Sequence, residues 1–300
     1  MLTQEKVHRA SGPNRARMVP IEDYIPQRCC ARQIFTTNFN SPFEMAKTVL
    51  ITGAAGGLGK AIADAFLAGG ANVAVCDVNP PRIAAVEEEW TKSYDGKFLV
   101  QQADVTDGAS VQSLVDATVS KFGRLDVLIN NAGVMDDFSP VGACSKETWD
   151  RVLNINLNGP YITSKIAVAQ FEKQEPAGGI IINMGSSASY HGFKAGAAYS
   201  VSKAGVMALT KNTAGFYGPK GIYSIALLLG GMNTNITDAF AKGMHMEAYQ
   251  AIAASQSPPS AEKMVPIESV AKYCVFLSEK DIATSANGSC IVFNNNWPEA

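Results

Sequence analysis

The segment Thr48-Val-Leu-Ile-Thr-Gly-Ala-Ala-Gly-Gly-Leu-Gly59 decides the fold. Its first five residues form a short apolar run, which is typical of a strand buried on both faces of a sheet. The glycines that follow predict a tight turn, and residues 57–68 have helical spacing, with Leu58, Ile62 and Phe66 on one face. A strand, a glycine-rich turn and a helix in this order predict the first half of a βαβ unit.

The chain from Lys47 onward continues to alternate strands with helices. Apolar or extended segments predict strands at 72–76, 97–101, 126–130, 180–184, 223–229 and 289–293, with helices at 81–94, 108–122, 146–172, 197–217 and near 267–278. Apolar strands separated by amphipathic helices predict a parallel sheet covered on both faces, and right-handed crossovers then give a doubly wound α/β fold. No linker interrupts this pattern, so residues 45–300 are expected to form one domain.

Residues 1–44 differ from the rest because they contain four prolines and lack a sustained apolar period. They have no apolar core of a secretory signal, and their acidic residues argue against a transit peptide. We expect an N-terminal extension that is poorly ordered or lies over the surface. Two alternatives stay open, namely a targeting role and translation that begins at Met45.

The composition excludes several classes of protein. Of the 300 residues, 47% are hydrophobic and 17% are charged, and the formal net charge is −2. This near-neutral net charge predicts no basic surface of the kind that binds nucleic acid. No apolar run approaches the roughly 20 residues of a membrane span. Six cysteines without a C-x-x-C pair favour the cytoplasm, and three separated histidines argue against a metal site. The low charged fraction favours a homo-oligomer, in which part of the surface is covered.

A carboxylate follows the second predicted strand, where a doubly wound fold can bind the adenosine ribose of a dinucleotide. Asp77 comes 18 residues after Gly59, and it could accept hydrogen bonds from both ribose hydroxyls but would repel a 2′-phosphate. The glycine turn would face the pyrophosphate, unless it is only a tight corner. The turn contains no cation and the next residue is Val78, so the sequence favours NAD over NADP. The alternative for Asp77 is a simple strand-end cap.

Beyond these features, the chain resembles the short-chain dehydrogenase/reductase family over about residues 46–297. The resemblance is carried by motifs in a fixed order: Thr52-Gly-Ala-Ala-Gly-Gly-Leu-Gly59, Asp104-Val105, Asn130-Asn131-Ala132-Gly133, Asn156, Ser186 and Tyr199-Ser-Val-Ser-Lys203. It implies a single Rossmann-type domain with a seven-stranded parallel sheet. It also implies an NAD(H)-dependent interconversion of a secondary alcohol and a ketone, by a dimer or tetramer.

The resemblance also implies which residues bind the cofactor. Asp104 and Val105 would meet the adenine. Asn131 and Ala132 would line the cofactor groove, and Thr234 would contact the nicotinamide amide. Together with the glycine turn, the expected set is Gly53, Ala55, Gly56, Gly57, Leu58, Gly59, Asp77, Val78, Asp104, Val105, Asn131, Ala132, Gly133, Tyr199, Lys203 and Thr234.

A phenol and an ammonium four residues apart carry the expected chemistry. On a helix, Tyr199 and Lys203 share one face, and Ser186 lies 13 residues before Tyr199. The ammonium, together with a positive nicotinamide ring, would lower the pKa of Tyr199 and let it act as a general acid or base. Ser186, rather than Ser187, would stabilise charge on the substrate oxygen. The resemblance implies that Asn156 holds a water that links Lys203 to solvent.

Residues from about 232 to 266 are expected to form a lid over the substrate. The alternative is an amphipathic helix that packs on its own domain. Asp136 and Asp137, near the expected pocket mouth, argue against a strongly anionic substrate. We therefore expect a mostly apolar or cyclic small molecule, surrounded by lid residues that include Phe240, Met244, His245, Met246 and Tyr249.

Two stretches depart from the family pattern. Leu229-Gly230 stands where the family usually has Pro-Gly, and Phe293-Asn-Asn-Asn296 replaces an ending with two glycines. Neither departure removes a catalytic group. They nevertheless leave two alternatives open, namely a nucleotide-binding protein with a non-redox role and a ketoreductase that uses NADP.

Overall fold

The computed structural model of this chain describes residues 46–234, 236, 243–255 and 258–297. The expected extension 1–44 therefore lies outside the described residues, as do parts of the expected lid. In chain order, the elements are β1 (Thr48–Thr52), α1 (Gly57–Ala68), β2 (Asn72–Asp77), α2 (Pro80–Thr91), β3 (Phe98–Gln102), α3 (Gly108–Phe122), β4 (Val127–Asn130), α4 (Lys146–Leu153), α5 (Gly159–Lys173), β5 (Gly179–Ser186), α6 (Ala197–Tyr217), β6 (Ile222–Leu229), α7 (Met246–Ser255), α8 (Ile267–Leu277), α9 (Lys280–Ser285) and β7 (Cys290–Phe293).

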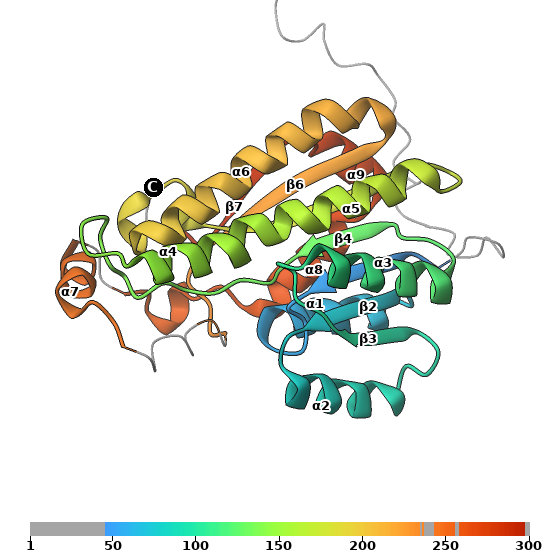
Figure 1. The fold of residues 1–300 in the computed structure, drawn as a ribbon, viewed down its shortest axis with the longest axis horizontal. Helices are drawn as coiled ribbons and strands as arrows, with labels where there is room; N and C mark the ends of the chain where they lie inside the picture. The colour runs from blue at the N-terminus through green and yellow to red at the C-terminus, as the bar shows by residue number, and fades with distance from the viewer. Residues whose placement is uncertain (1–45, 235, 237–242, 256–257, 298–300) are drawn as a thin grey trace, which may run out of the picture. The chain divides into compact units, whose positions relative to one another are not determined.

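The described strands form one parallel sheet in the order β3-β2-β1-β4-β5-β6-β7 (Figure 1). Leu50 of β1 pairs with Ala74 of β2 on one side and with Leu128 of β4 on the other. The strand order therefore reverses between β1 and β4, and a crevice opens outside the carboxyl ends of strands at such a point. The predicted doubly wound fold with a seven-stranded parallel sheet is confirmed.

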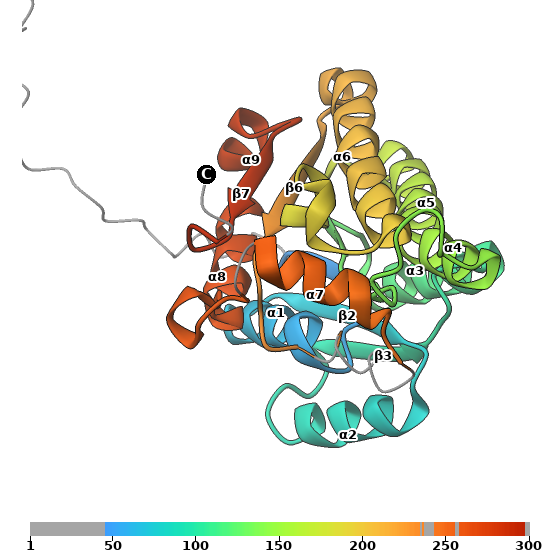
Figure 2. The same cartoon turned by 90° about the vertical axis from the view of Figure 1, so that its left-hand side faces the viewer.

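Alternate residues of the central strand pack against opposite layers of helices. Val49 and Ile51 lie in the core that β1 shares with α1, α2 and α8, whereas Leu50 lies in the core shared with α3 and α5. Figure 2 shows these two groups of helices on opposite sides of the sheet. Because both faces are buried, the strand sequences are continuously apolar instead of alternating.

The helix expected over 146–172 is interrupted. The α4 helix ends at Leu153, a π-helical turn spans Asn154–Asn158, and α5 begins at Gly159. A π-helical turn inserts one residue into a helix, so the apolar spacing on either side still reads as one helix. Such turns are frequent at functional sites, and this one contains the fully buried side chain of Asn156.

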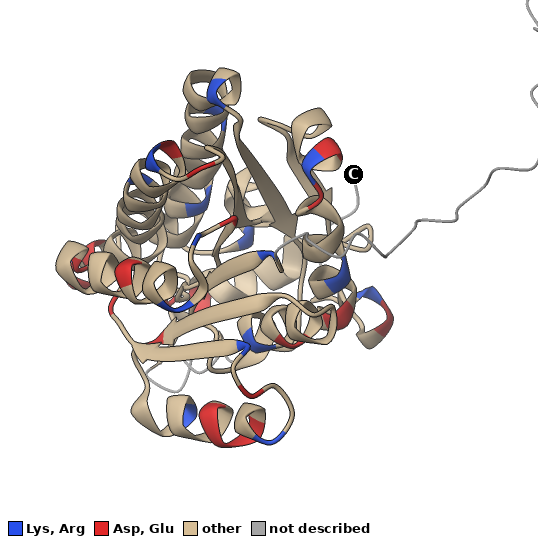
Figure 3. Cartoon of the chain, turned by 90° about the vertical axis from the view of Figure 1, so that its right-hand side faces the viewer, with Lys and Arg blue, Asp and Glu red and all other residues tan. Residues whose placement is uncertain are grey.

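Basic and acidic residues are interspersed over the outer helices of the described chain (Figure 3). Some of them form pairs one turn apart, such as Lys60 with Asp64 on α1 and Lys92 with Glu88 on α2. Within the described ranges, no helix is both long and apolar enough to cross a membrane. Nor do three or more His, Cys, Asp or Glu side chains of those residues lie together as a metal site would require.

Candidate active site

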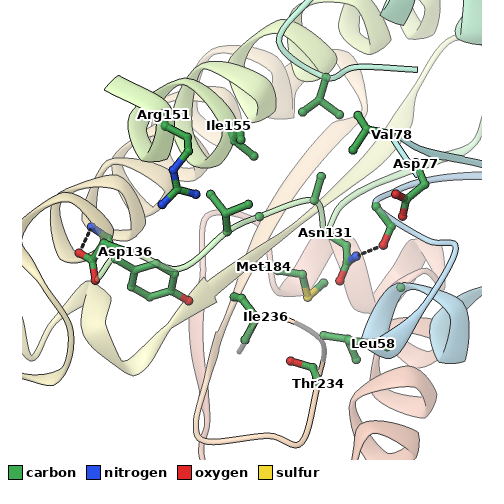
Figure 4. A pocket seen from close by; sticks show the side chains of 18 of the residues that line it. Leu58, Asp77, Val78, Asn131, Asp136, Arg151, Ile155, Met184, Thr234 and Ile236 are labelled. Carbon is green, nitrogen blue, oxygen red and sulfur yellow. Dashed lines mark hydrogen bonds between the residues drawn. The ribbon is translucent and has the colours of Figure 1, made fainter. Parts of the chain in front are cut away.

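A cleft of about 1160 Å³ lies along the carboxyl ends of the central strands, where the strand order reverses. Figure 4 shows Asp77 and Val78 at one end, Asp136 and Arg151 at the other, and Met184 between them. Ordinary small-molecule pockets have volumes of about 300–1,000 Å³. The larger volume of this cleft suits an extended ligand together with a second, smaller one.

Nearly all of the residues expected to bind the cofactor line this cleft. The exception is Ala55, which is buried beneath the turn and donates its backbone N–H to Asp77 Oδ2 at 3.2 Å. The residues that line the cleft are Gly53, Gly56, Gly57, Leu58, Gly59, Asp77, Val78, Asp104, Val105, Asn131, Ala132, Gly133, Tyr199, Lys203 and Thr234.

Two glycines allow the first turn to approach the end of β4 closely. Gly53 has a φ of +61°, and a Cβ at this position would lie 2.8 Å from the Cα of Ala132. A Cβ on Gly59 would lie 2.5 Å from Asn131 Nδ2. That amide donates hydrogen bonds of 2.9 Å to the carbonyl oxygens of Thr52 and Gly53. Asn131 therefore ties the turn to β4, a structural role in addition to lining the cleft.

The amino end of α1 fits an anionic ligand. Its N-cap residue is Gly56, which offers no side-chain cap, and no acidic residue lies in the first turn. Gly56, Gly57 and Leu58 all line the cleft. The free N–H groups and the positive end of the helix dipole at this point can therefore bind the diphosphate of a dinucleotide.

The carboxylate of Asp77 lies at the opposite side of the same turn. Its two oxygens accept one hydrogen bond each from the backbone, at 3.2 Å from Ala55 and 3.1 Å from Asn79. Each oxygen has a further lone pair that can accept a ribose hydroxyl. Arg82, in the first turn of α2, also lines this end of the cleft. The sequence analysis missed it because only Val78 was considered as a neighbour of Asp77.

The structure brings Tyr199, Lys203 and Ser186 together. Tyr199 and Lys203 lie on one face of α6, with the Lys203 Nζ atom 5.6 Å from the centre of the Tyr199 ring. The Ser186 side chain, at the end of β5, lies near the Tyr199 hydroxyl and acts on its pKa. Lys203 Nζ donates a 2.8 Å hydrogen bond to the carbonyl of Met184 on the same strand. Both α6 side chains are buried, and both line the cleft.

Burial changes the expected acidity of this group. It raises the pKa of Tyr199 to about 12, although the nearby Ser186 side chain acts in the opposite direction. Burial also lowers the pKa of Lys203 to about 8. The expected lowering of the Tyr199 pKa is therefore not found in the chain alone, because loss of water around a buried phenolate outweighs the nearby ammonium. Tyr199 is a neutral phenol near pH 7 and can donate a proton.

Asn156 lies behind this group and does not line the cleft. Its Oδ1 atom accepts the backbone N–H of Val134 at 2.8 Å, while Nδ2 donates to the carbonyl of Val134 at 2.8 Å and to Ser202 Oγ at 3.2 Å. A Cβ on Gly133 would lie 3.3 Å from Asn156 Oδ1 and 3.6 Å from Lys203 Nζ. The side chain therefore holds the loop after β4 against α6. The water relay to Lys203 stays a prediction.

Part of the expected lid contributes to the cleft. Met244 and His245 line it, and Tyr249 of α7 packs edge-on against Phe138 with the ring centres 5.2 Å apart. The His245 N–H donates to the carbonyl of Asp137 at 2.8 Å. The described part of the lid is thus attached to the loop after β4. Phe240 lies outside the described residues.

The end of the cleft opposite Asp77 also contains residues that were not identified from the sequence. Arg151 of α4 lines it and donates from Nη2 to the carbonyl of Met135 at 3.1 Å. Apolar side chains cover much of the remaining wall. They are Val134, Ile155, Met184, Leu229, Met232 and Ile236. The periodicity of α4 shows that Arg151 and Ile155 share a helix face, but only the fold shows that this face borders the cleft.

The two departures from the family pattern are accommodated by the backbone. Asn295 and Asn296 have φ values of +51° and +53°, a left-handed region that glycine adopts freely and asparagine tolerates better than most residues. Asn295 Nδ2 donates to the carbonyl of Glu262 at 2.7 Å, so the tail holds the segment before α8. Leu229 is buried and lines the cleft.

This sheet has a glycine-rich turn and a carboxylate at its switch point, which is the arrangement of a dinucleotide-binding α/β protein. The family model described as short chain dehydrogenase matches residues 47–245. The chain belongs to the short-chain dehydrogenase/reductase family of oxidoreductases, which bind a nicotinamide cofactor.

Several known proteins are similar over most of their length. The chain is 44% identical over 262 residues to short chain dehydrogenase/reductase dpchG of Colletotrichum higginsianum, covering 86% of this chain and 96% of that protein. It is 32% identical over 259 residues to 3beta-hydroxysteroid dehydrogenase 2 of Eggerthella lenta, covering 86% and 97%. The crystal structure of levodione reductase has a TM-score of 0.75 and 28% identity, covering 85% of this chain and 98% of that one.

Proposed function

We propose that the protein is an NAD(H)-dependent oxidoreductase that interconverts a secondary alcohol and a ketone on a mostly apolar or cyclic small molecule. Tyr199 is its general acid and base. The observation that carries this proposal is the buried pair of Tyr199 and Lys203 on the wall of a cleft whose far end holds Asp77, with Ser186 near the phenol.

The described residues would hold the cofactor along the cleft. The free N–H groups at the start of α1 would bind the diphosphate, and Asp77 would accept the ribose hydroxyls. Asp104 and Val105 would meet the adenine, and Thr234 would contact the nicotinamide amide. When bound, the nicotinamide ring donates or accepts the hydride.

The protein's own residues would handle the proton. In ketone reduction, the neutral Tyr199 phenol donates its proton to the carbonyl oxygen as negative charge develops there. The Ser186 hydroxyl donates a hydrogen bond to the same oxygen. The Lys203 ammonium stabilises the phenolate that remains. Alcohol oxidation uses the same contacts in reverse, with Tyr199 accepting the proton.

The substrate end of the cleft supports a mostly apolar substrate. Its wall includes Val134, Ile155 and Met184, and methionine adapts to irregular ligands. A relative at 32% identity is named for a hydroxysteroid, which is a cyclic and largely apolar alcohol. The argument from Asp136 against an anionic substrate is weakened, because the backbone satisfies that buried carboxylate and Arg151 lines the same end.

A ketoreductase that uses NADP is the second candidate. The observation that favours it is Arg82, a cation that lines the cleft beside the expected ribose site. We favour NAD because the Asp77 carboxylate borders the same site and would repel a 2′-phosphate.

Turnover of a panel of cyclic ketones and alcohols with NADH, NAD, NADPH and NADP tests the activity. Tyr199→Phe should abolish turnover while the fluorescence of bound NADH shows unchanged affinity. Tyr217→Phe, at the other end of the same helix, is the matched control and should keep full activity. Cofactor binding without turnover of any substrate by the unaltered protein would instead favour the non-redox alternative.

We also propose that the protein is a homo-oligomer, a dimer or tetramer. The outer faces of α5 and α6 carry exposed apolar side chains, with exposed fractions of 50% for Tyr161, 46% for Val201 and 71% for Phe216. Large apolar side chains exposed on the outer faces of these helices favour a contact between subunits. The molar mass by light scattering tests this, and a monomer at assay concentration would contradict it.

A further inference from the structure

The loop after β4 contains a buried carboxylate to which the proposed reaction assigns no role. Asp136 is 1% exposed, and no ion pair of the described residues includes it. Its partners are three backbone N–H groups. Oδ1 accepts from Phe138 and Gly196, each at 3.1 Å, and Oδ2 accepts from Tyr199 at 2.9 Å. A buried charge of this kind is retained only where its hydrogen bonds are satisfied.

Two of those N–H groups lie at the start of α6, one on its N-cap residue Gly196 and one on Tyr199 in its first turn. This helix begins after Gly196, which supplies no side-chain cap. Asp136, in the loop after β4 and about 60 residues earlier in the sequence, caps the helix with its carboxylate. Its negative charge is favourable beside the positive end of the helix dipole. A Cβ on Gly196 would collide with the Asp136 carboxylate, so glycine permits this approach.

The third N–H group belongs to a strained residue. Phe138 has a φ of +65°, which is unusual for a residue with a bulky side chain. The carboxylate of Asp136 therefore fixes two backbone segments at once, namely the turn at Phe138 and the residue that carries the phenol. Figure 4 shows Asp136 at the end of the cleft opposite Asp77, on the side of the substrate.

We propose that Asp136 is a positioning residue for Tyr199. It holds the backbone of Tyr199 by a direct hydrogen bond, so that the phenol stays within reach of Ser186 and of the substrate oxygen. This inference rests on the proposed function, because it assigns Asp136 a role in that reaction that acts through Tyr199. It gives Asp136 a task beyond the stability of α6, since displacing a reacting group by about 1 Å can cost about 100-fold in rate.

Asp136→Asn tests this role with little change in shape. The asparagine NH₂ group would then face a backbone N–H group and could not accept its hydrogen bond. We expect kcat for the best ketone to fall at least about tenfold, while KM and the Kd of NADH stay within about twofold. Gly196→Ala, which displaces the carboxylate without removing it, should give the same pattern. Equal kcat in the variants and the unaltered protein would overturn the proposal.

Asp107→Asn is the matched control. Asp107 caps α3 by accepting the N–H of Ala109 at 3.0 Å, and that helix contributes no residue to the cleft. Its loss should lower the melting temperature without lowering kcat. A carboxylate that only stabilised a helix would give this same result at Asp136, and that result would overturn the proposal.

A spectroscopic titration tests the contact without turnover. The charge of Asp136 raises the pKa of Tyr199, and the other polar groups at this phenol are Ser186 and Lys203. Tyrosinate absorbance, taken as the difference between each protein and its Tyr199→Phe form, should show Tyr199 ionising at lower pH in Asp136→Asn. An unchanged titration would overturn the proposal. Absence of ketone turnover in the unaltered protein would contradict the proposed function but would leave this absorbance change measurable.

Discussion

The Nζ atom of Lys203 donates a hydrogen bond of 2.8 Å to the carbonyl oxygen of Met184. This contact turns the ammonium toward β5 and toward the floor of the cleft that Met184 lines. Because burial lowers the pKa of Lys203 to about 8, the ammonium is present at neutral pH and is lost well below the usual value for lysine.

Ketone reduction is therefore expected to slow as the pH rises through about 8. Above this pKa, Lys203 is neutral and no longer stabilises the phenolate left on Tyr199. Tyr199 itself, with a pKa of about 12, remains protonated and does not cause the loss. The measurement is kcat against pH at saturating cofactor. Lys203→Arg keeps the charge and should move the loss to higher pH, whereas a flat profile up to pH 10 in the unaltered protein would contradict the prediction.

Ser186 and Ser187 are adjacent in the sequence. Their alanine variants show which of the two hydroxyls contacts the reacting oxygen of the substrate and which has only a structural role. Ser186→Ala should lower kcat by about 100-fold with little change in KM, because its hydrogen bond strengthens as charge develops on the substrate oxygen. Ser187, which is buried, provides the matched control. Ser187→Ala should stay within about threefold of the unaltered rate. The reverse order of the two effects would show that the role was assigned to the wrong serine.

Asp77 is expected to set the preference between the two nicotinamide cofactors. Asp77→Asn keeps the shape but removes the charge, so NADH should bind more weakly and NADPH should no longer be repelled. We expect the ratio of the two Kd values to change about tenfold in favour of NADPH, which is about 1.4 kcal/mol. Fluorescence titration with each reduced cofactor measures this ratio. Arg82→Ala is the complementary variant, and it should weaken NADPH more than NADH if Arg82 borders the 2′-position.

The features that were predictable from sequence are those that depend on local pattern. The apolar run Thr48–Thr52 and the glycines after it predict a buried strand and a tight turn into a helix, and the structure contains both. The roles of Asp136 and Arg82 were not predictable, because each depends on which distant element the fold brings near. Asp136 reaches Tyr199 across 63 positions of sequence. The raised pKa of Tyr199 was missed for a related reason, since burial is a property of the fold.

The interruption of the helix at Asn154–Asn158 shows a different limit. The backbone stays right-handed and helical through these residues, so the sequence on either side is interpreted as one helix. Asn156 was identified from a motif, and the water relay expected there stays a prediction. The hydrogen bonds from its side chain to both backbone groups of Val134 were not predictable from that motif. A motif can therefore indicate the position of a residue while leaving its physical role to the geometry.

Gly59→Ala should weaken cofactor binding through the shape of the first turn. The added Cβ would lie 2.5 Å from both Asn131 Nδ2 and the carbonyl oxygen of Gly53, which is closer than a real Cβ approaches. The turn must shift, and the hydrogen bonds from Asn131 that hold it would be strained. We expect about 1–3 kcal/mol of lost stability. The Kd for NADH should rise about tenfold, because the N–H groups at the start of α1 move away from the diphosphate.

Gly142→Ala is the control for this prediction. No heavy atom lies within 4 Å of a Cβ at Gly142, and its φ is not positive. Its melting temperature and NADH affinity should therefore match those of the unaltered protein. If Gly59→Ala also bound NADH with unchanged affinity, the start of α1 would not be where the diphosphate binds. Lost stability with unchanged affinity would show that Gly59 serves only the packing of the turn against Asn131.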